Sequence, residues 1–185
     1  MIRFPLVWLL LFFLSFGCGS DKKQKAIDDN TDVVQVQTDE KTTFVDFPVY
    51  DFDSLEPLLN KKDDKTYIIN FWATWCAPCV AELPYFERTF AEQQEKSSNV
   101  EMILVSLDMP SMWESRLVPF VNKKKLKGEV VILNDTRMND WIPKIDSEWD
   151  GGIPATLIYN SKKRAFYPHG FTYEELNKEL NKFIN

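Results

Sequence analysis

Hydrophobic and polar positions divide this chain into three stretches. After one basic residue, Arg3, residues 4–16 form a nearly unbroken apolar run. Residues 19–43 are polar and contain no aromatic side chain, so they cannot bury enough apolar surface to offset the entropy lost on folding. From Phe44 onward, apolar and aromatic residues recur with the periods of strands and helices. We therefore predict a flexible tether followed by one globular domain over residues 44–185.

Within that domain, short apolar runs alternate with stretches of helical spacing. The runs at 66–72, 100–107 and 130–133 are continuous and of buried-strand length, whereas those at 156–159 and 164–167 are joined by four polar residues, as in a hairpin. Helical spacing is found at residues 53–59, 79–96, 111–127, 137–149 and 172–184. This alternation predicts an α/β fold in which a central mixed β-sheet is flanked by helices on both faces.

The N-terminal apolar run has the features of an export signal. It is about a dozen residues long, short of the roughly 20 that a bilayer-crossing helix needs. A basic start, a short apolar stretch and the small residue Gly17 predict a signal peptide over residues 1–17. Cys18 follows directly, and the arrangement resembles the lipobox of bacterial lipoproteins, although Ser15 replaces the usual Leu. The resemblance implies that Cys18 is acylated and that residues 18–43 tether an exported domain to a membrane, facing the periplasm; an uncleaved anchor is the alternative.

Composition and charge exclude several classes of protein. Lys and Arg total 22 against 28 Asp and Glu, a net charge of −6, which argues against nucleic acid as a partner. The basic run at 123–127 (KKKLK) is interpreted as a solvated helix end. With 44% hydrophobic and 14% aromatic residues, disorder of the whole chain is excluded. Three cysteines and one histidine are too few for a disulfide-stapled scaffold or a self-contained zinc site, so we expect no metal.

The candidate chemistry lies in a Cys-x-x-Cys pair, Cys76 and Cys79, between a predicted buried strand and a predicted helix. Unpaired N–H groups and the dipole at a helix N-terminus favour a thiolate, so Cys76 is predicted to be the attacking sulfur and Cys79 the resolving one. A half zinc site lacks a second pair, and the sole histidine, His169, is distant in sequence. A structural disulfide across two residues would constrain little chain entropy. Redox catalysis is therefore the favoured interpretation.

The stretch at 70–84, NFWATWCAPCVAELP, resembles thioredoxin-like proteins, and most closely the membrane-tethered thiol–disulfide oxidoreductases of TlpA/ResA type. The resemblance extends over residues 44–185. It implies a thioredoxin-like fold with a strand–helix insertion in residues 113–149. It also implies a protein-disulfide oxidoreductase whose only redox group is its own cysteine pair, with protein dithiols or disulfides as substrates and an upstream membrane electron donor.

The same resemblance assigns further site residues. Pro154, in the GGIPAT segment at 151–156, is implied to form a cis peptide bond facing the cysteine pair, and the backbone of Ile153 to pair with an extended substrate. Trp75 is expected to form part of an apolar rim on which partner proteins dock.

Glu82 matches an active-site glutamate of the ResA-like branch. Thioredoxin has a buried Asp six residues before its first Cys, but Asn70 occupies that position here. Glu82, three residues after Cys79 on the same helical face, is therefore expected to exchange a proton with that thiol. A solvated helix residue is the alternative interpretation of Glu82.

Two functions remain open at this point. The first is reduction of disulfides in protein substrates through a mixed disulfide, in cytochrome maturation or redox homeostasis. The alternative is a copper(I)-handling metallochaperone that uses the cysteine pair and His169. The intervening residues Ala77 and Pro78 match neither the common reductant dipeptide nor the common oxidant one, so they do not set the direction of electron flow.

Overall fold

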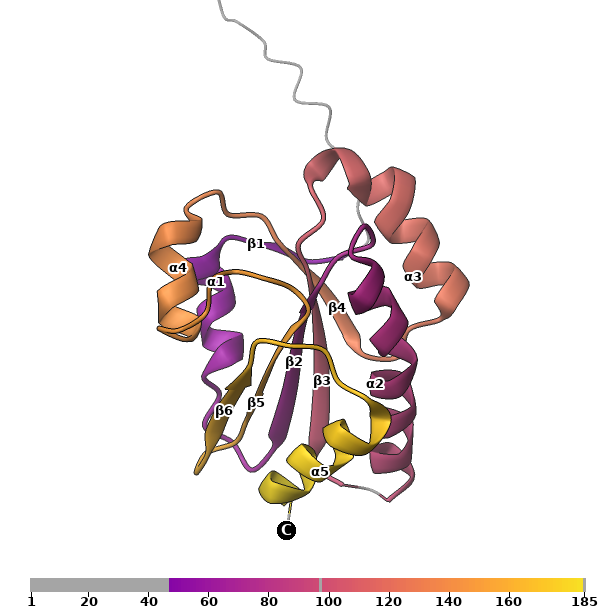
Figure 1. The fold of residues 1–185 in the computed structure, drawn as a ribbon, viewed down its shortest axis with the longest axis vertical. Helices are drawn as coiled ribbons and strands as arrows, with labels where there is room; N and C mark the ends of the chain where they lie inside the picture. Colours follow the sequence, from indigo (N-terminus) through magenta and orange to yellow (C-terminus); the bar gives the residue numbers. More distant parts are fainter. Residues whose placement is uncertain (1–46, 97, 185) are drawn as a thin grey trace, which may run out of the picture. The chain divides into compact units, whose positions relative to one another are not determined.

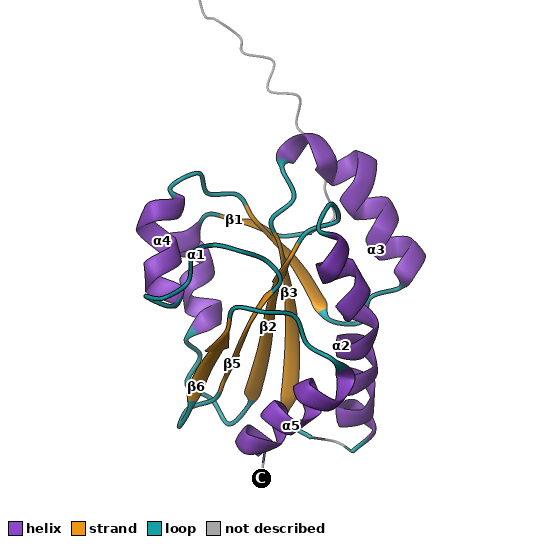
Figure 2. Cartoon of the chain, viewed as in Figure 1, coloured by secondary structure: helices purple, strands orange, loops and turns teal. Residues whose placement is uncertain are grey.

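A mixed β-sheet of six strands carries the fold, with helices packed on both of its faces (Figure 1) (Figure 2). This computed structural model describes residues 47–96 and 98–184, and the predicted signal peptide, Cys18 and tether lie outside them. The strand order is β1-β4-β3-β2-β5-β6; the first four strands run parallel, and β5 and β6 each pair antiparallel with the strand before them. The strands are β1 Val49–Tyr50, β2 Thr66–Trp72, β3 Val100–Ser106, β4 Glu129–Leu133, β5 Ala155–Tyr159 and β6 Arg164–Tyr167.

Helices cover the two faces of the sheet unequally. One face carries α2, α3 and α5, and the other carries α1 and α4 (Figure 1). The helices are α1 Phe52–Leu55, α2 Ala77–Glu95, α3 Val118–Lys124, α4 Met138–Ile145 and α5 Tyr173–Ile184. The predicted α/β class, with a central mixed sheet between two helical layers, is confirmed. None of the helices in the described part of the chain has the length and apolar character needed to cross a bilayer.

Strand β2 explains why the central strands are continuous apolar runs. Successive side chains of a strand point to opposite faces, so Ile68 and Trp72 pack under α2 while Ile69 and Phe71 pack toward α1 and α4. All seven residues of β2 are buried. A strand buried on both faces needs no polar alternation. This central strand leads directly to the cysteine pair, which is thus supported by two hydrophobic cores.

The insertion predicted at 113–149 supplies α3, β4 and α4, and β4 pairs between β3 and β1. The prediction of one regular helix over residues 111–127 is wrong. This stretch starts as a 3₁₀ turn and a π turn before α3, and the helix ends at Lys124 because Lys125 adopts a left-handed φ of 54°. The short edge strand β1 was not predicted, since two residues are too few to show a period.

Candidate active site

The cysteine pair lies at the end of β2, where the chain turns into α2. Cys76 and Cys79 form a disulfide, with 5.3 Å between their Cα atoms. Cys76 is the N-cap of the 19-residue helix α2, and the backbone N–H of Cys79 lies 3.3 Å from its Sγ and donates to it. Cys76 is 6% exposed and Cys79 is 0% exposed. One sulfur is therefore reachable at the positive end of a long helix while the other is enclosed, an asymmetry that favours the predicted attacking role of Cys76.

A buried carboxyl holds the loop before the cysteines. Asp108, 2% exposed, follows the end of β3. It accepts hydrogen bonds from the backbone N–H of Thr74 at 3.0 Å, from the Thr74 hydroxyl at 2.6 Å and from the Ser106 hydroxyl at 2.9 Å. Its own carbonyl accepts from the indole N–H of Trp113 at 2.7 Å. Sequence reasoning missed this residue; a lone Asp directly after a buried strand parallel to β2 was the available signal.

The peptide bond between Ile153 and Pro154 is cis, which confirms the prediction. The carbonyl oxygen of Ile153 lies 3.7 Å from Sγ of Cys76, so the loop before β5 faces the disulfide. Two features shape this loop: Gly151 has a φ of 87°, and the indole N–H of Trp149 donates to the Gly152 carbonyl at 2.8 Å. The backbone predicted to pair with substrate thus lies beside Sγ of Cys76.

Glu82 is buried, at 3% exposed, so the alternative of a solvated helix residue is wrong. Its Oε1 accepts from the Asn70 side-chain amide at 2.9 Å, and its Oε2 accepts from the backbone N–H of Phe171 at 2.7 Å. Burial raises the pKa of the Glu82 carboxyl, and the hydrogen bonds from Phe171 and Asn70 only partly oppose that effect. A carboxyl in this setting is suited to take up and release a proton above the usual range of a glutamate.

The surroundings of Glu82 are closely fitted. A Cβ added at Gly170 would lie 3.1 Å from Oε2 of Glu82 and 3.3 Å from Cγ of Pro154, so a glycine allows this loop to approach both residues. The Asn70 amide nitrogen also donates to the Thr156 hydroxyl at 3.2 Å, whereas its buried Oδ1 has no hydrogen-bond partner among the described residues. Glu82 and the cis-Pro154 loop are thereby parts of one site.

Trp75 is 50% exposed beside Cys76, so its side chain is available to a partner, as the predicted docking role requires. The ring of His169 packs near those of Tyr167 and Phe171, and its Nδ1 is 2.9 Å from the carbonyl of Gly170, in the loop that approaches Glu82. Within residues 47–96 and 98–184, no group of three or more His, Cys, Asp or Glu side chains is placed to hold a metal ion. The structure therefore brings together Trp75, the cysteine pair, Glu82 and Pro154.

Comparison with known proteins identifies the family. Residues 41–164 match the AhpC/TSA family. The thiol-disulfide oxidoreductase ResA of Geobacillus kaustophilus is 32% identical over 141 residues, which cover 75% of this chain and 75% of that protein. ResA of Oceanobacillus iheyensis is 50% identical over 50 residues, which span 27% of this chain but only 25% of that protein.

A solved structure agrees on the fold. The thioredoxin-related protein from Neisseria meningitidis serogroup B superposes with a TM-score of 0.55 at 20% identity, over 66% of this chain and 86% of that chain. At such low identity the likeness shows the fold alone, which is that of thioredoxin. The chain therefore belongs to the AhpC/TSA family, and within it to the thioredoxin-like group of ResA-type thiol–disulfide oxidoreductases.

Proposed function

We propose that this protein reduces disulfides in protein substrates outside the cytoplasm, using Cys76 and Cys79 as its only redox group. The observation that carries the proposal is the asymmetry of the pair: Cys76 caps α2 next to the carbonyl of Ile153, and Cys79 is fully enclosed behind it. A slightly accessible sulfur followed by a fully enclosed one suits a nucleophile followed by a resolving thiol.

The reaction proceeds in two exchanges. The Cys76 thiolate of the reduced protein attacks a substrate disulfide, forms a mixed disulfide and expels one substrate thiolate. The Cys79 thiol then loses its proton and attacks Sγ of Cys76, which releases the second substrate thiolate and closes the Cys76–Cys79 disulfide. Two electrons pass to the substrate, and an upstream membrane dithiol returns them to the protein. The setting we propose for this reaction is cytochrome maturation or redox homeostasis.

Glu82 accepts the proton that Cys79 must lose. Its carboxyl is buried three residues after Cys79 on α2, and burial raises its pKa toward the range in which a thiol exchanges protons. Asn70 and the backbone N–H of Phe171 fix the carboxyl by one hydrogen bond to each oxygen. Glu82 is thus held in place while it changes charge.

The backbone before Pro154 aligns the substrate. The Ile153 carbonyl faces Sγ of Cys76, so an extended substrate strand that pairs there would bring its cysteine to the attacking sulfur. The half-exposed Trp75, next to Cys76 in the chain, adds an apolar contact that requires no particular substrate sequence.

Trapping tests the assignment of the two sulfurs. Cys79→Ser should accumulate mixed disulfides with substrate proteins through Cys76, because the resolving thiol is gone. Cys76→Ser, the matched control, should trap few or none. Equal trapping by both variants would mean that the roles are assigned wrongly, and no trapping by either would contradict the reductase proposal. A measured reduction potential more positive than that of the substrate disulfides would reverse the direction of electron flow.

Lipid anchoring through Cys18 is part of the proposal and has its own test. Acyl chains on Cys18 would keep the domain at the membrane, since two or more chains anchor far better than one. Cys18→Ser should abolish labelling of the protein by a radioactive fatty acid and leave an uncleaved precursor. Labelling at the wild-type level in this variant would refute the lipoprotein assignment.

A further inference from the structure

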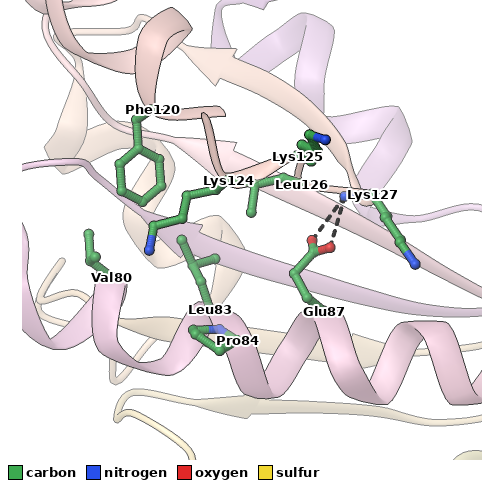
Figure 3. A pocket seen from close by; sticks show the side chains of 9 residues that line it. All are labelled: Val80, Leu83, Pro84, Glu87, Phe120, Lys124, Lys125, Leu126 and Lys127. Carbon is green, nitrogen blue, oxygen red and sulfur yellow. Dashed lines mark hydrogen bonds between the residues drawn. The ribbon is translucent and has the colours of Figure 1, made fainter. Parts of the chain in front are cut away.

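A groove with an apolar floor and a basic rim runs between α2 and the end of α3 (Figure 3). Its volume is about 420 Å³. Val80, Leu83 and Pro84 of α2 form one side, and Phe120 and Leu126 form the other. Neither the redox chemistry nor the cis-proline loop accounts for this surface.

The groove begins one helical turn from the reactive sulfur. Val80 lies four residues after Cys76, on the same face of α2, and its N–H donates to the Cys76 carbonyl at 3.0 Å. Pro84 and Glu87 continue this face by two more turns. From Cys76 to Glu87 the helix rises about 16 Å, which an extended peptide spans with about five residues.

The groove and the cis-proline loop lie on opposite flanks of α2. In the sheet, β2 lies between β3 and β5; α3 connects β3 to β4, whereas Pro154 precedes β5. A polypeptide bound through its cysteine to Cys76 can therefore contact the cis-proline loop with one part and the groove with a neighbouring part.

The rim of the groove is positively charged in a protein whose net charge is −6. Lys124, Lys125 and Lys127 line it, and Figure 3 shows Lys124 extending over the floor between Phe120 and Leu83. Among the described residues, none of the three ammonium groups lies within 4.0 Å of a carboxylate oxygen. The one carboxylate in the groove, Glu87, accepts instead from the backbone N–H of Lys127 at 2.9 Å.

We propose that this groove binds an extended segment of the protein substrate in which an apolar residue and carboxylates lie within about five residues of the reactive cysteine. The apolar side chain packs on Val80, Pro84 and Phe120, and the carboxylates meet the lysine rim. This inference rests on the proposed function and adds a substrate preference to it. The solvated helix end expected from the sequence at 123–127 is thereby given a binding role.

Peptide substrates of defined charge test the preference. Each of the three peptides carries one cysteine as a pyridyl disulfide, with a leucine within five residues on either side. The peptides differ only in the pair of residues that follows the leucine in this stretch: two glutamates, two lysines or two glutamines. Attack by reduced protein on the peptide sulfur releases thiopyridone, whose absorbance gives the rate. We expect the glutamate peptide to react about five- to tenfold faster than the lysine peptide at low salt, and the difference to shrink at high salt.

Matched lysine pairs locate the effect. Lys124→Gln with Lys127→Gln should remove most of that preference and leave the rate with dipyridyl disulfide unchanged. The control pair, Lys162→Gln with Lys163→Gln, removes the same charge from the β5–β6 connection. Because these two lysines do not line the groove, this variant should keep the preference.

The outcomes separate this inference from the function on which it rests. Equal rates for the three wild-type peptides, or equal losses in the two lysine pairs, would overturn the groove proposal while leaving the reductase intact. Salt-sensitive binding of the domain to anionic vesicles that is lost only in the Lys124/Lys127 pair would also overturn it, in favour of a lipid surface. Failure to reduce even dipyridyl disulfide would instead contradict the proposed function.

Discussion

Asp108 is expected to be the main polar support of the active-site loop, and its removal should be costly. The side chain is 2% exposed and accepts hydrogen bonds from three donors, namely the N–H and hydroxyl of Thr74 and the hydroxyl of Ser106. A buried donor left without a partner costs about 1–3 kcal/mol. Thr74 is half-buried, so water can reach part of it. We therefore expect Asp108→Ala to lower the free energy of unfolding by about 3 kcal/mol.

Urea unfolding of the oxidised protein, followed by tryptophan fluorescence, measures this loss. Thr74→Val removes only the hydroxyl and should cost about 1 kcal/mol. In a double-mutant cycle with Asp108→Ala, the coupling energy should be about 1–2 kcal/mol, because the two side chains are in direct contact. A loss below about 1 kcal/mol for Asp108→Ala, or a coupling energy below about 0.5 kcal/mol, would refute this account of the loop.

Three further predictions concern single residues. Glu82→Gln should remove one ionisation from the pH profile of disulfide exchange between about pH 5 and 9 and slow exchange by about 10²-fold at most; superimposable profiles would exclude a proton-transfer role. Arg137 holds the pKa of Asp135 well below its usual range, so this carboxylate stabilises the fold above about pH 4 and the contribution is lost as the pH falls through its folded-state pKa. Asp135→Asn should therefore weaken the dependence of the free energy of unfolding on pH in the acid range. An acid-unfolding curve with unchanged midpoint and slope would contradict the role of the ion pair. Lys125→Gly should raise the free energy of unfolding by about 1 kcal/mol in urea, since Lys125 has a φ of 54°; a decrease would show that its side-chain contacts outweigh the backbone strain.

The sequence predicted features that depend on short-range patterns. The central strands followed from continuous apolar runs, and the family resemblance of the segment at 151–156 implied the cis bond at Pro154. The burial of Glu82 could not be predicted in this way, because helical spacing is compatible with either a solvated or a buried side chain at this position. Its burial depends on Phe171, 89 residues away in the chain, and no local period reports that contact. Asp108 was missed for the same reason, since its partner Thr74 comes from a different strand end.

The buried Asn70 amide has a consequence for proton transfer in an enclosed site. At present its Nδ2 donates to Oε1 of Glu82, which suits an ionised carboxylate, and its Oδ1 is left without a partner among the described residues. A half-turn of the amide would present Oδ1 instead, which accepts a hydrogen bond from a protonated carboxylic acid. One side chain thus offers a matching partner to both charge states of Glu82. An aspartate of the thioredoxin type at this position would accept from protonated Glu82 when ionised, but it could donate to ionised Glu82 only by carrying a proton of its own.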